Sequence, residues 1–414
     1  MANNVLNPTI IAKAAIRILD NELVASKRVY RGYEEEISKS VNGYKVGASV
    51  NIRKPTQFTV RSGAVASMQD VTEGQTSITV DKQRGIDFRF TSTELTLNIG
   101  ELSERVIKPA MVQLANEMDA TVLGLVNQVP NLVGTRGADV NTFAKFMAGV
   151  RRLNEGAVPS DDRAAILSPA DHAALIGNQT SLYISGPAGD AYRDADLGKI
   201  AGTPTFMTQN APSLTTGSRT NGTVSGAAQQ VTYDTVKNTT GIPGTQTLNV
   251  AGLGAAGTVK AGEVFTLAGV FDVNPVTKAV LPYLKQFVVT ADATADGAGA
   301  AALSICPAII LSGAFKSAHI AAGTLATATV LTWNGAASTT FQENLILHKN
   351  AFGLVVVPME RPQGATKVVT ESYKGLTVRM IPYYDGTNDV DNYRLDVLYG
   401  VKALDQRLAT RLNG

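Results

Sequence analysis

One long amphipathic stretch constrains the fold more than any other part of the sequence. Between residues 109 and 129, apolar side chains recur at spacings of three and four, the periodicity of one buried helical face: Met111, Leu114, Met118, Val122, Leu125 and Val129. Pro109 suits the first turn, because the N–H that proline lacks would be unbonded there. A helix of this length would be roughly 30 Å long, so we expect a strut. We expect Gln113, Glu117 and Asn127 to lie away from the core.

The composition indicates a large chain without a strong preference for charged partners. Its 414 residues are enough for two or three domains, and 37 Lys and Arg nearly balance 35 Asp and Glu, so no net charge draws it to nucleic acid or an acidic membrane. The single cysteine, Cys306, excludes an intramolecular disulfide and a multi-cysteine zinc site and is typical of a reducing compartment. Without a signal peptide or a run of ~20 apolar residues, we expect a soluble, cytoplasmic protein.

The region before residue 100 contains segments that need support from elsewhere. Residues 8 to about 40 have a helical pattern whose apolar stripe is too short to fold alone, so it must lie on this subunit or on a neighbour. Two β segments follow at 44–60 and 75–90, and because a two-stranded ribbon is marginal in water, either a larger sheet or a charged partner would have to support them. These segments and their connection are unusually charged, at Arg53, Lys54, Arg61, Asp81, Lys82, Arg84, Asp87 and Arg89.

The chain after the long helix divides into regions of different composition. Residues 139–167 predict a helix that ends at Gly156 and a short buried strand at 164–167, and Ser168 is a suitable N-cap for a second helix, which together make an α+β unit ending near residue 210. Only 11 of the chain's 72 charged residues (37 + 35) lie between 211 and 340, where short strands alternate with glycine-rich turns. This pattern predicts a small all-β module, such as a barrel, inserted into the α+β body.

Few motifs in the sequence carry chemistry. Residues 252–257 read GLGAAG, a formal match to a dinucleotide-binding loop, but no helix pattern follows, so a turn between strands is favoured. The aspartates between 385 and 391 lack the spacing of an EF-hand and favour a polar hairpin turn. Cys306 lies in an apolar run that should raise its pKa, and His348 has no partner nearby in sequence. We therefore expect no enzyme activity, no catalytic or cofactor-binding residues, and no cofactor or metal.

Three stretches resemble a known family. Residues 262–297 (GEVFTLAGVFDVNPVTKAVLPYLKQFVVTADATADG), 343–362 (ENLILHKNAFGLVVVPMERP) and 391–412 (DNYRLDVLYGVKALDQRLATRL) are similar to major capsid proteins of tailed double-stranded-DNA bacteriophages, of the short-tailed type with an inserted β-barrel domain. The resemblance implies an α+β major capsid fold with these parts: N-terminal arm, 1–40; extended β-hairpin loop, 41–100; spine helix, 101–130; peripheral domain and start of the axial domain, 131–215; inserted β domain, 216–338; axial domain and return strands of the peripheral domain, 339–414.

The resemblance also implies a function and a set of partners. The chain would self-assemble, as hexamers and pentamers, into an icosahedral shell around the phage DNA, with a scaffolding protein, a portal protein and non-specific contacts to the packaged DNA, and with no membrane partner. It would be made in the bacterial host cytoplasm and end in the virion. Within this interpretation, the eight charged residues named above are expected to be inter-subunit contacts.

Three other functions remain as alternatives. A bacterial encapsulin-type nanocompartment subunit would share the fold but enclose protein cargo. A nucleotide-binding enzyme built on residues 252–257 would have to bind a nicotinamide cofactor. A β-rich adhesin or tail fibre would lack the long helix.

Overall fold

The computed structural model describes most of the chain, in eight stretches: 8–33, 40–41, 44–45, 49–91, 106–179, 197–362, 364 and 368–414. Residues 1–7, 34–39, 42–43, 46–48, 92–105, 180–196, 363 and 365–367 lie outside the described residues. They belong to the predicted arm (1–40), extended loop (41–100), spine region (101–130), peripheral domain (131–215) and C-terminal part (339–414). The chain forms two compact units, each a mixture of helices and strands. The first unit comprises Met1–Asn51, Ser77–Val122 and Gly353–Lys402, and the second comprises Ile52–Thr76, Leu123–Phe352 and Ala403–Gly414.

A five-stranded sheet forms the core of the first unit. Its central strand, β25 (Val390–Ala403), pairs with β5 (Lys82–Thr91) along one edge and with β24 (Leu376–Asp385) along the other. Beyond β24 lies β23 (Val369–Tyr373), and β22 (Phe352–Val357) also pairs with β25. The predicted polar turn joins β24 to β25, as the sequence indicated.

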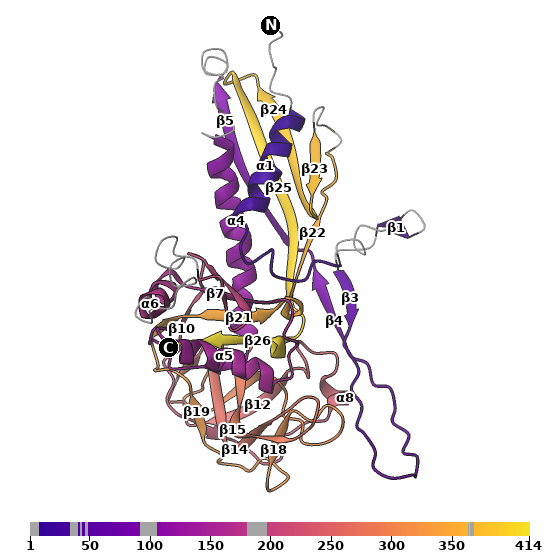
Figure 1. Cartoon of the computed structure of the whole chain (residues 1–414), viewed down its shortest axis with the longest axis vertical. Coiled ribbons are helices and arrows are strands. Elements are labelled where there is room, and N and C mark those ends of the chain that lie inside the picture. The colour runs from indigo at the N-terminus through magenta and orange to yellow at the C-terminus, as the bar shows by residue number, and fades with distance from the viewer. Residues whose placement is uncertain are drawn as a thin grey trace. The chain divides into compact units, whose positions relative to one another are not determined.

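The long amphipathic helix lies along this sheet as α4 (Lys108–Leu123) (Figure 1). The hydroxyl group of Thr121 on α4 lies 3.1 Å from the hydroxyl group of Tyr399 on β25. The six apolar side chains predicted to be buried are all buried, so the predicted helical face is confirmed. Gln113 and Glu117 are exposed as predicted.

The far end of the predicted helix differs in winding. From Gly124 to Gln128 the chain forms a 3-10 helix, η2, with about 3.0 residues per turn instead of 3.6. Within this turn Asn127 is half-buried, and its Oδ1 atom is buried without a hydrogen-bond partner among the described residues. The prediction that Asn127 lies away from the core is therefore wrong.

The arm helix lies on its own subunit. α1 (Pro8–Glu22) contacts β23 and β24, and its apolar stripe is buried at Ile11, Ala12, Ala15, Ile16 and Leu19. The expectation that the helix continues to about residue 40 is wrong, because it ends at Glu22. The next backbone N–H groups, of Val24, Ala25 and Ser26, donate to the carboxylate of Asp119 instead of to helix carbonyls.

The two predicted β segments pair with each other over only part of their length. β3 (Ser49–Arg53) pairs with β4 (Gln75–Thr79), and Lys54 N–H donates to Gly74 O at 2.7 Å where this pairing ends. β5 pairs with β25 instead, so the charged strand belongs to a larger sheet. The predicted strand up to residue 60 is wrong beyond Arg53, because its partner strand begins only at Gln75. Farther toward the N-terminus, Ser40–Val41 (β1) pairs with Tyr44–Lys45 (β2).

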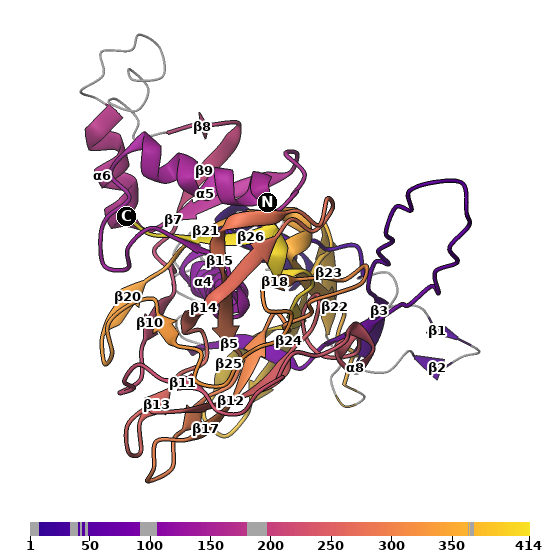
Figure 2. The same ribbon diagram turned by 90° about the horizontal axis from the view of Figure 1, so that it is seen from below.

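The second unit contains a six-stranded sheet covered by two helices. The sheet runs β6 (Leu132–Val133), β26 (Ala409–Leu412), β21 (Asn344–His348), β7 (Arg163–Leu167), β9 (Thr203–Met207) and β8 (Lys199–Ile200). α5 (Phe143–Glu155) and α6 (Pro169–Gln179) lie on one side of β21 and β26 (Figure 2). Gly156 caps α5, and Ser168 Oγ accepts from Asp171 N–H at the start of α6, so both predicted helix boundaries are confirmed.

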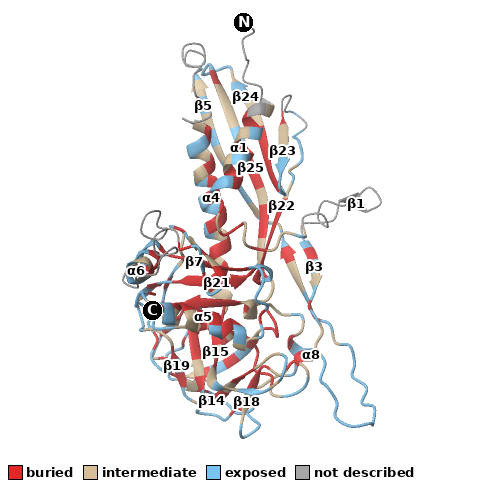
Figure 3. Ribbon diagram, viewed as in Figure 1, coloured by how far each residue is buried: buried red, intermediate tan, exposed pale blue. Residues whose placement is uncertain are grey.

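Between residues 216 and 338, strand pairings run in a ring. The order is β14 (Val264–Val273), β15 (Val280–Val289), β17 (Ala301–Cys306), β12 (Gln246–Ala251) and β11 (Thr223–Val224), and β14 pairs on its other edge with β19 (Leu331–Trp333). Two hydrogen bonds close the ring, from Val224 N–H to Thr329 O and from Leu331 N–H to Gly222 O, both 2.9 Å. The apolar side chains inside are buried (Figure 3).

Short elements complete the second unit. β18 (Ala318–Ile320) also pairs with β14, β13 (Thr258–Val259) pairs with β16 (Ala293–Thr294), and β10 (Ser213–Thr215) pairs with β20 (Thr340–Gln342) where the ring-forming segment begins and ends. The remaining elements among this unit's described residues are one short helix and two 3-10 turns: α8 (Tyr233–Val236), η4 (Lys349–Ala351) and η5 (Gln406–Leu408).

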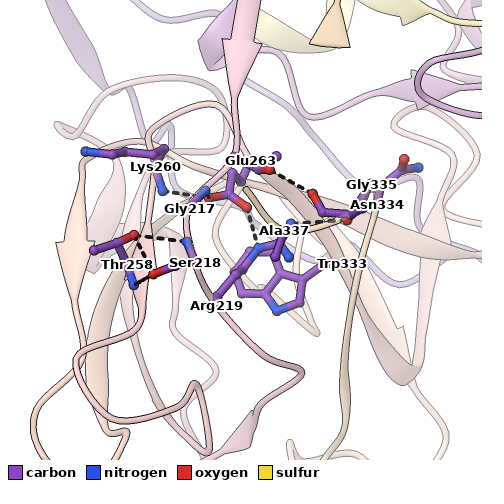
Figure 4. Close-up of polar contacts among 12 residues, drawn as sticks. Gly217, Ser218, Arg219, Thr258, Lys260, Glu263, Trp333, Asn334, Gly335 and Ala337 are labelled. Carbon is purple, nitrogen blue, oxygen red and sulfur yellow. Dashed lines mark hydrogen bonds and ion pairs between the residues drawn. The ribbon is translucent and has the colours of Figure 1, made fainter. Parts of the chain in front are cut away.

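A buried ion pair between Arg219 and Glu263 holds the start of the ring-forming segment against its interior. Glu263 is fully buried and accepts hydrogen bonds from the N–H groups of Gly217 and Lys260 and from the Arg219 guanidinium (Figure 4). The Arg219 guanidinium lies 4.2 Å from the centre of the Trp333 ring. Glu263 therefore ties the first residues of the segment to its core.

Candidate functional site

The segment between β3 and β4, residues 54–74, is an extended loop whose outer part is exposed to solvent. Every residue from Phe58 to Val71 is exposed (Figure 3). Five of these side chains are large and apolar, with exposed fractions of 56% (Phe58), 100% (Val60), 85% (Val65), 94% (Met68) and 66% (Val71). Large apolar side chains that are exposed together on one segment are typical of protein–protein contact sites.

Hydrogen bonds within the extended loop hold its two legs together. Gln69 accepts from the N–H and hydroxyl groups of Thr59 at 2.8 and 2.9 Å, and its amide donates to Thr59 O at 2.6 Å. Arg61 donates to the carbonyl oxygens of Gly63 and Val65, the second at 3.1 Å. The loop therefore has a defined local shape although solvent surrounds its side chains.

The charged residues at the base of the extended loop have different environments. Arg53 forms an exposed ion pair with Glu73 at 3.3 Å. Lys54, by contrast, is only 3% exposed, and its Nζ donates to Thr239 O at 2.5 Å. The structure thus places Lys54 inside its own subunit, apart from the other charged residues predicted to be contacts.

The remaining charged residues lie on or beside β5. Asp81 is exposed and 3.9 Å from Lys82, and Arg84 donates to Glu117 of α4 at 2.8 Å. The hydrogen bond to Glu117 raises the pKa of Arg84. Asp87 and Arg89 are exposed, and because side chains alternate along a strand, they lie on the sheet face opposite Arg84.

Asp119 is a buried anchor that sequence reasoning missed. It is 3% exposed, and its two carboxylate oxygens accept from Val24 N–H (2.6 Å), Ala25 N–H (3.2 Å), Ser26 N–H (2.9 Å) and the Ser26 hydroxyl group (2.6 Å). The available signal was its position, since Asp119 follows Met118 within the buried face of α4. A carboxylate there requires donors from another segment.

The motifs weighed for chemistry have structural roles. Residues 252–257 form a turn after β12, where Gly252 and Gly254 adopt positive φ angles of 79° and 88°. Burial raises the pKa of Cys306 to about 12, and its thiol donates to Gln406 Oε1 at 3.0 Å. His348 Nδ1 accepts from Asn350 N–H at 3.2 Å and caps η4. The turn and the raised pKa of Cys306 agree with prediction, whereas His348 does have a partner close in sequence, at Asn350.

The aspartates between 385 and 391 stabilise the turn that joins β24 to β25. Asp385 accepts from Thr387 N–H and from the Asn388 amide, and Asp389 accepts from the Tyr384 hydroxyl group. Over the described stretches, no three His, Cys, Asp or Glu side chains gather into a group suited to a metal ion. No described helix has the length and apolar character that a membrane crossing needs.

Comparison with known proteins identifies the family. Residues 1–410 match the family model of the P22 coat protein, gene protein 5. The chain belongs to the P22 coat protein family. It is a major capsid subunit, and copies of it form a viral shell. The eight charged residues therefore belong to a shell protein, but their roles in contacts between subunits remain a prediction.

The chain is also similar to solved structures, of which the first supports the fold. A structure from Mycobacterium phage Che8 has a TM-score of 0.50 and 13% identity, covering 94% of this chain and 91% of that chain. The capsid of cyanophage P-SCSP1u has a TM-score of 0.43 and 11% identity, with coverages of 89% and 84%. The mature capsid of bacteriophage PhiM1 has a TM-score of 0.42 and 11% identity, with coverages of 89% and 82%. No curated protein sequence matches the chain.

Proposed function

We propose that the extended loop is the main element through which one coat subunit binds its neighbour in the shell. The observation that carries this proposal is the complete exposure of residues 58–71 together with their five large apolar side chains. A coat subunit functions only among copies of itself, so a neighbouring subunit is the partner that such a surface fits. Burying these side chains would supply about 25 cal/mol per Å² of apolar area removed from water.

The proposed contact residues divide by their environment. Seven side chains, of which six are exposed and Lys82 is half-buried, are offered as inter-subunit contacts: Arg53, Arg61, Asp81, Lys82, Arg84, Asp87 and Arg89. Lys54 supports the loop from inside. Each exposed ion pair would contribute about 0–1 kcal/mol, which is weak enough for misplaced subunits to dissociate before a shell closes.

The wider assignment follows the parts expected from sequence. The ring of strands between 216 and 338 serves as the inserted barrel domain and α4 as the spine. One part changes: the first unit's sheet, built from β5 and the strands between 352 and 403, serves as the peripheral domain in place of residues 131–215. The shell is proposed to assemble as hexamers and pentamers on a scaffolding protein around a portal, within the bacterial cytoplasm. It then holds double-stranded DNA by non-specific contact. The role is purely structural, without catalysis.

Replacing the exposed apolar side chains tests the proposal directly. The triple variant Val60→Ser, Val65→Ser, Met68→Ser is expected to leave the free energy of unfolding of the isolated subunit within about 0.5 kcal/mol of wild type, because these side chains touch solvent. Shell assembly, measured by light scattering and electron microscopy, should fall at least tenfold. As a control, Val280→Ser, at an exposed position at the start of β15, should assemble normally. Wild-type shell yield from the triple variant would refute the proposal.

Arg84 offers a test that separates its role within the subunit from its role between subunits. The variant Arg84→Glu is expected to remain folded, since the Glu117 pair is exposed and worth about 1 kcal/mol at most. Its shells should be irregular or absent. The double variant Arg84→Glu, Glu117→Arg restores the pair within the subunit, but not a contact to a neighbour. If the double variant assembles like wild type, Arg84 acts only inside its own subunit.

A further inference from the structure

The two legs of the extended loop are attached to one short segment of the second unit, residues 233–239. Lys54, on the first leg, donates from Nζ to Thr239 O at 2.5 Å. Gln75, on the second leg, donates from its N–H group to Asn238 Oδ1 at 3.2 Å. The segment begins with α8 and belongs to the stretch that contains the ring of strands. The loop therefore has a support that is distant from it in sequence.

Gly74 shows how closely the loop and this segment pack. A Cβ atom at Gly74 would lie 2.2 Å from Lys237 O and 2.8 Å from the hydroxyl group of Tyr233. The Tyr233 ring stacks on Phe315, and both belong to a buried apolar cluster with Val236, Ala308 and Ile310. The surface that holds the loop is thus the outside of a packed core, and it cannot easily move aside.

A second contact lies farther along the first leg. Gln57 accepts from Lys278 Nζ at 3.0 Å, and Lys278 lies in the turn between β14 and β15. Gln57 and Phe58 also line an open groove of about 310 Å³ together with Pro275 and Val276 of the same turn. The loop is held at its base and again at the point where its exposed part begins.

We infer that the ring-forming stretch acts as a clamp that sets the direction of the extended loop, with Lys54, Gly74 and Lys278 as positioning residues for the contact between subunits. The inference rests on the proposed role of the loop. Two attachment points along one leg fix both the position and the direction of a hairpin, whereas one would leave it free to swing. In this way the ring-forming stretch sets the geometry of the contact between the extended loop and the neighbouring subunit.

The distance between the loop and the ring of strands tests the clamp. Nitroxide labels at Ala64→Cys and Ala322→Cys occupy exposed positions, and the native Cys306 is buried and stays unlabelled. In the unassembled full-length subunit, pulsed electron spin resonance should give a narrow distance distribution. Gly74→Ala should widen it at least twofold, and so should the double variant Lys54→Met, Lys278→Met. Fluorescence of Trp333, the single tryptophan, reports whether the ring remains folded.

Matched controls and shell assembly complete the experiment. Gly177→Ala adds a Cβ that meets nothing within 4 Å, and Lys260→Met removes an exposed lysine that pairs with Asp292, so both should keep the narrow distribution. A narrow distribution in both clamp variants would overturn the inference. A wide distribution with defective shells supports both the clamp and the proposed role of the loop. A wide distribution with regular shells supports the clamp and contradicts the proposed role of the loop.

Discussion

Replacing Asp119 by asparagine is expected to detach the residues after α1 from the spine helix and to lower the free energy of unfolding by about 3 kcal/mol. The carboxylate accepts four hydrogen bonds from Val24, Ala25 and Ser26 while it is almost fully buried. An amide keeps one acceptor oxygen but presents an NH₂ group where the carboxylate had a second acceptor, so at least one buried N–H donor loses its partner and faces another donor. Urea denaturation measures the loss of stability, and hydrogen exchange at residues 24–26 should accelerate at least a hundredfold.

Glu117→Gln is the matched control for this prediction. Glu117 lies two residues earlier on α4, and its side chain is exposed and paired with Arg84 at the surface. Its replacement should change the free energy of unfolding by less than about 1 kcal/mol and leave exchange at residues 24–26 unchanged. If Asp119→Asn has no larger effect than this control, the carboxylate does not anchor the arm.

Replacing Glu263 by glutamine is expected to destabilise the ring of strands by about 3–5 kcal/mol. Glu263 Oε1 accepts from Gly217 N–H at 2.8 Å and from Lys260 N–H at 2.7 Å, and Oε2 accepts from Arg219. The neutral amide would leave the Arg219 guanidinium charged, only 5% exposed and without its counter-ion. Because the guanidinium lies over Trp333, the fluorescence of this tryptophan should report the change as a lower denaturation midpoint.

The double variant Glu263→Leu, Arg219→Met distinguishes the charge effect from general loss of packing. It removes both charges, so it should destabilise the ring less than Glu263→Gln does, although it also loses the two backbone hydrogen bonds. A double variant that is less stable than the single one would show that the ion pair contributes mainly through packing and hydrogen bonding.

The sequence predicted local features well because their causes are local. The period of the apolar residues in α4, the glycine that ends α5 and the serine that begins α6 all act within one or two turns of chain. The winding of η2 was missed because the apolar spacing continues through it, so nothing in the pattern distinguishes a 3-10 turn from an α-helix. Asn127 was misplaced for that reason.

The features that the sequence could not supply depend on partners far away in the chain. Asp119 is held by residues more than 90 positions earlier, and Lys54 by Thr239, 185 positions later. A lysine in a charged segment and an aspartate in a helix look like surface residues until their partners are known. Likewise, β5 alternates as any strand does, and only its pairing with β25 reveals that it belongs to a sheet and not to a free ribbon.

Electron microscopy of the purified full-length protein, alone and with a candidate scaffolding protein, tests the central claim most directly. A coat subunit that binds its neighbours through the extended loop should form closed icosahedral shells of hexamers and pentamers. In these shells, residues 58–71 of each subunit should be covered by an adjacent subunit. A small oligomer of fixed size, or shells in which residues 58–71 stay in solvent, would contradict this account.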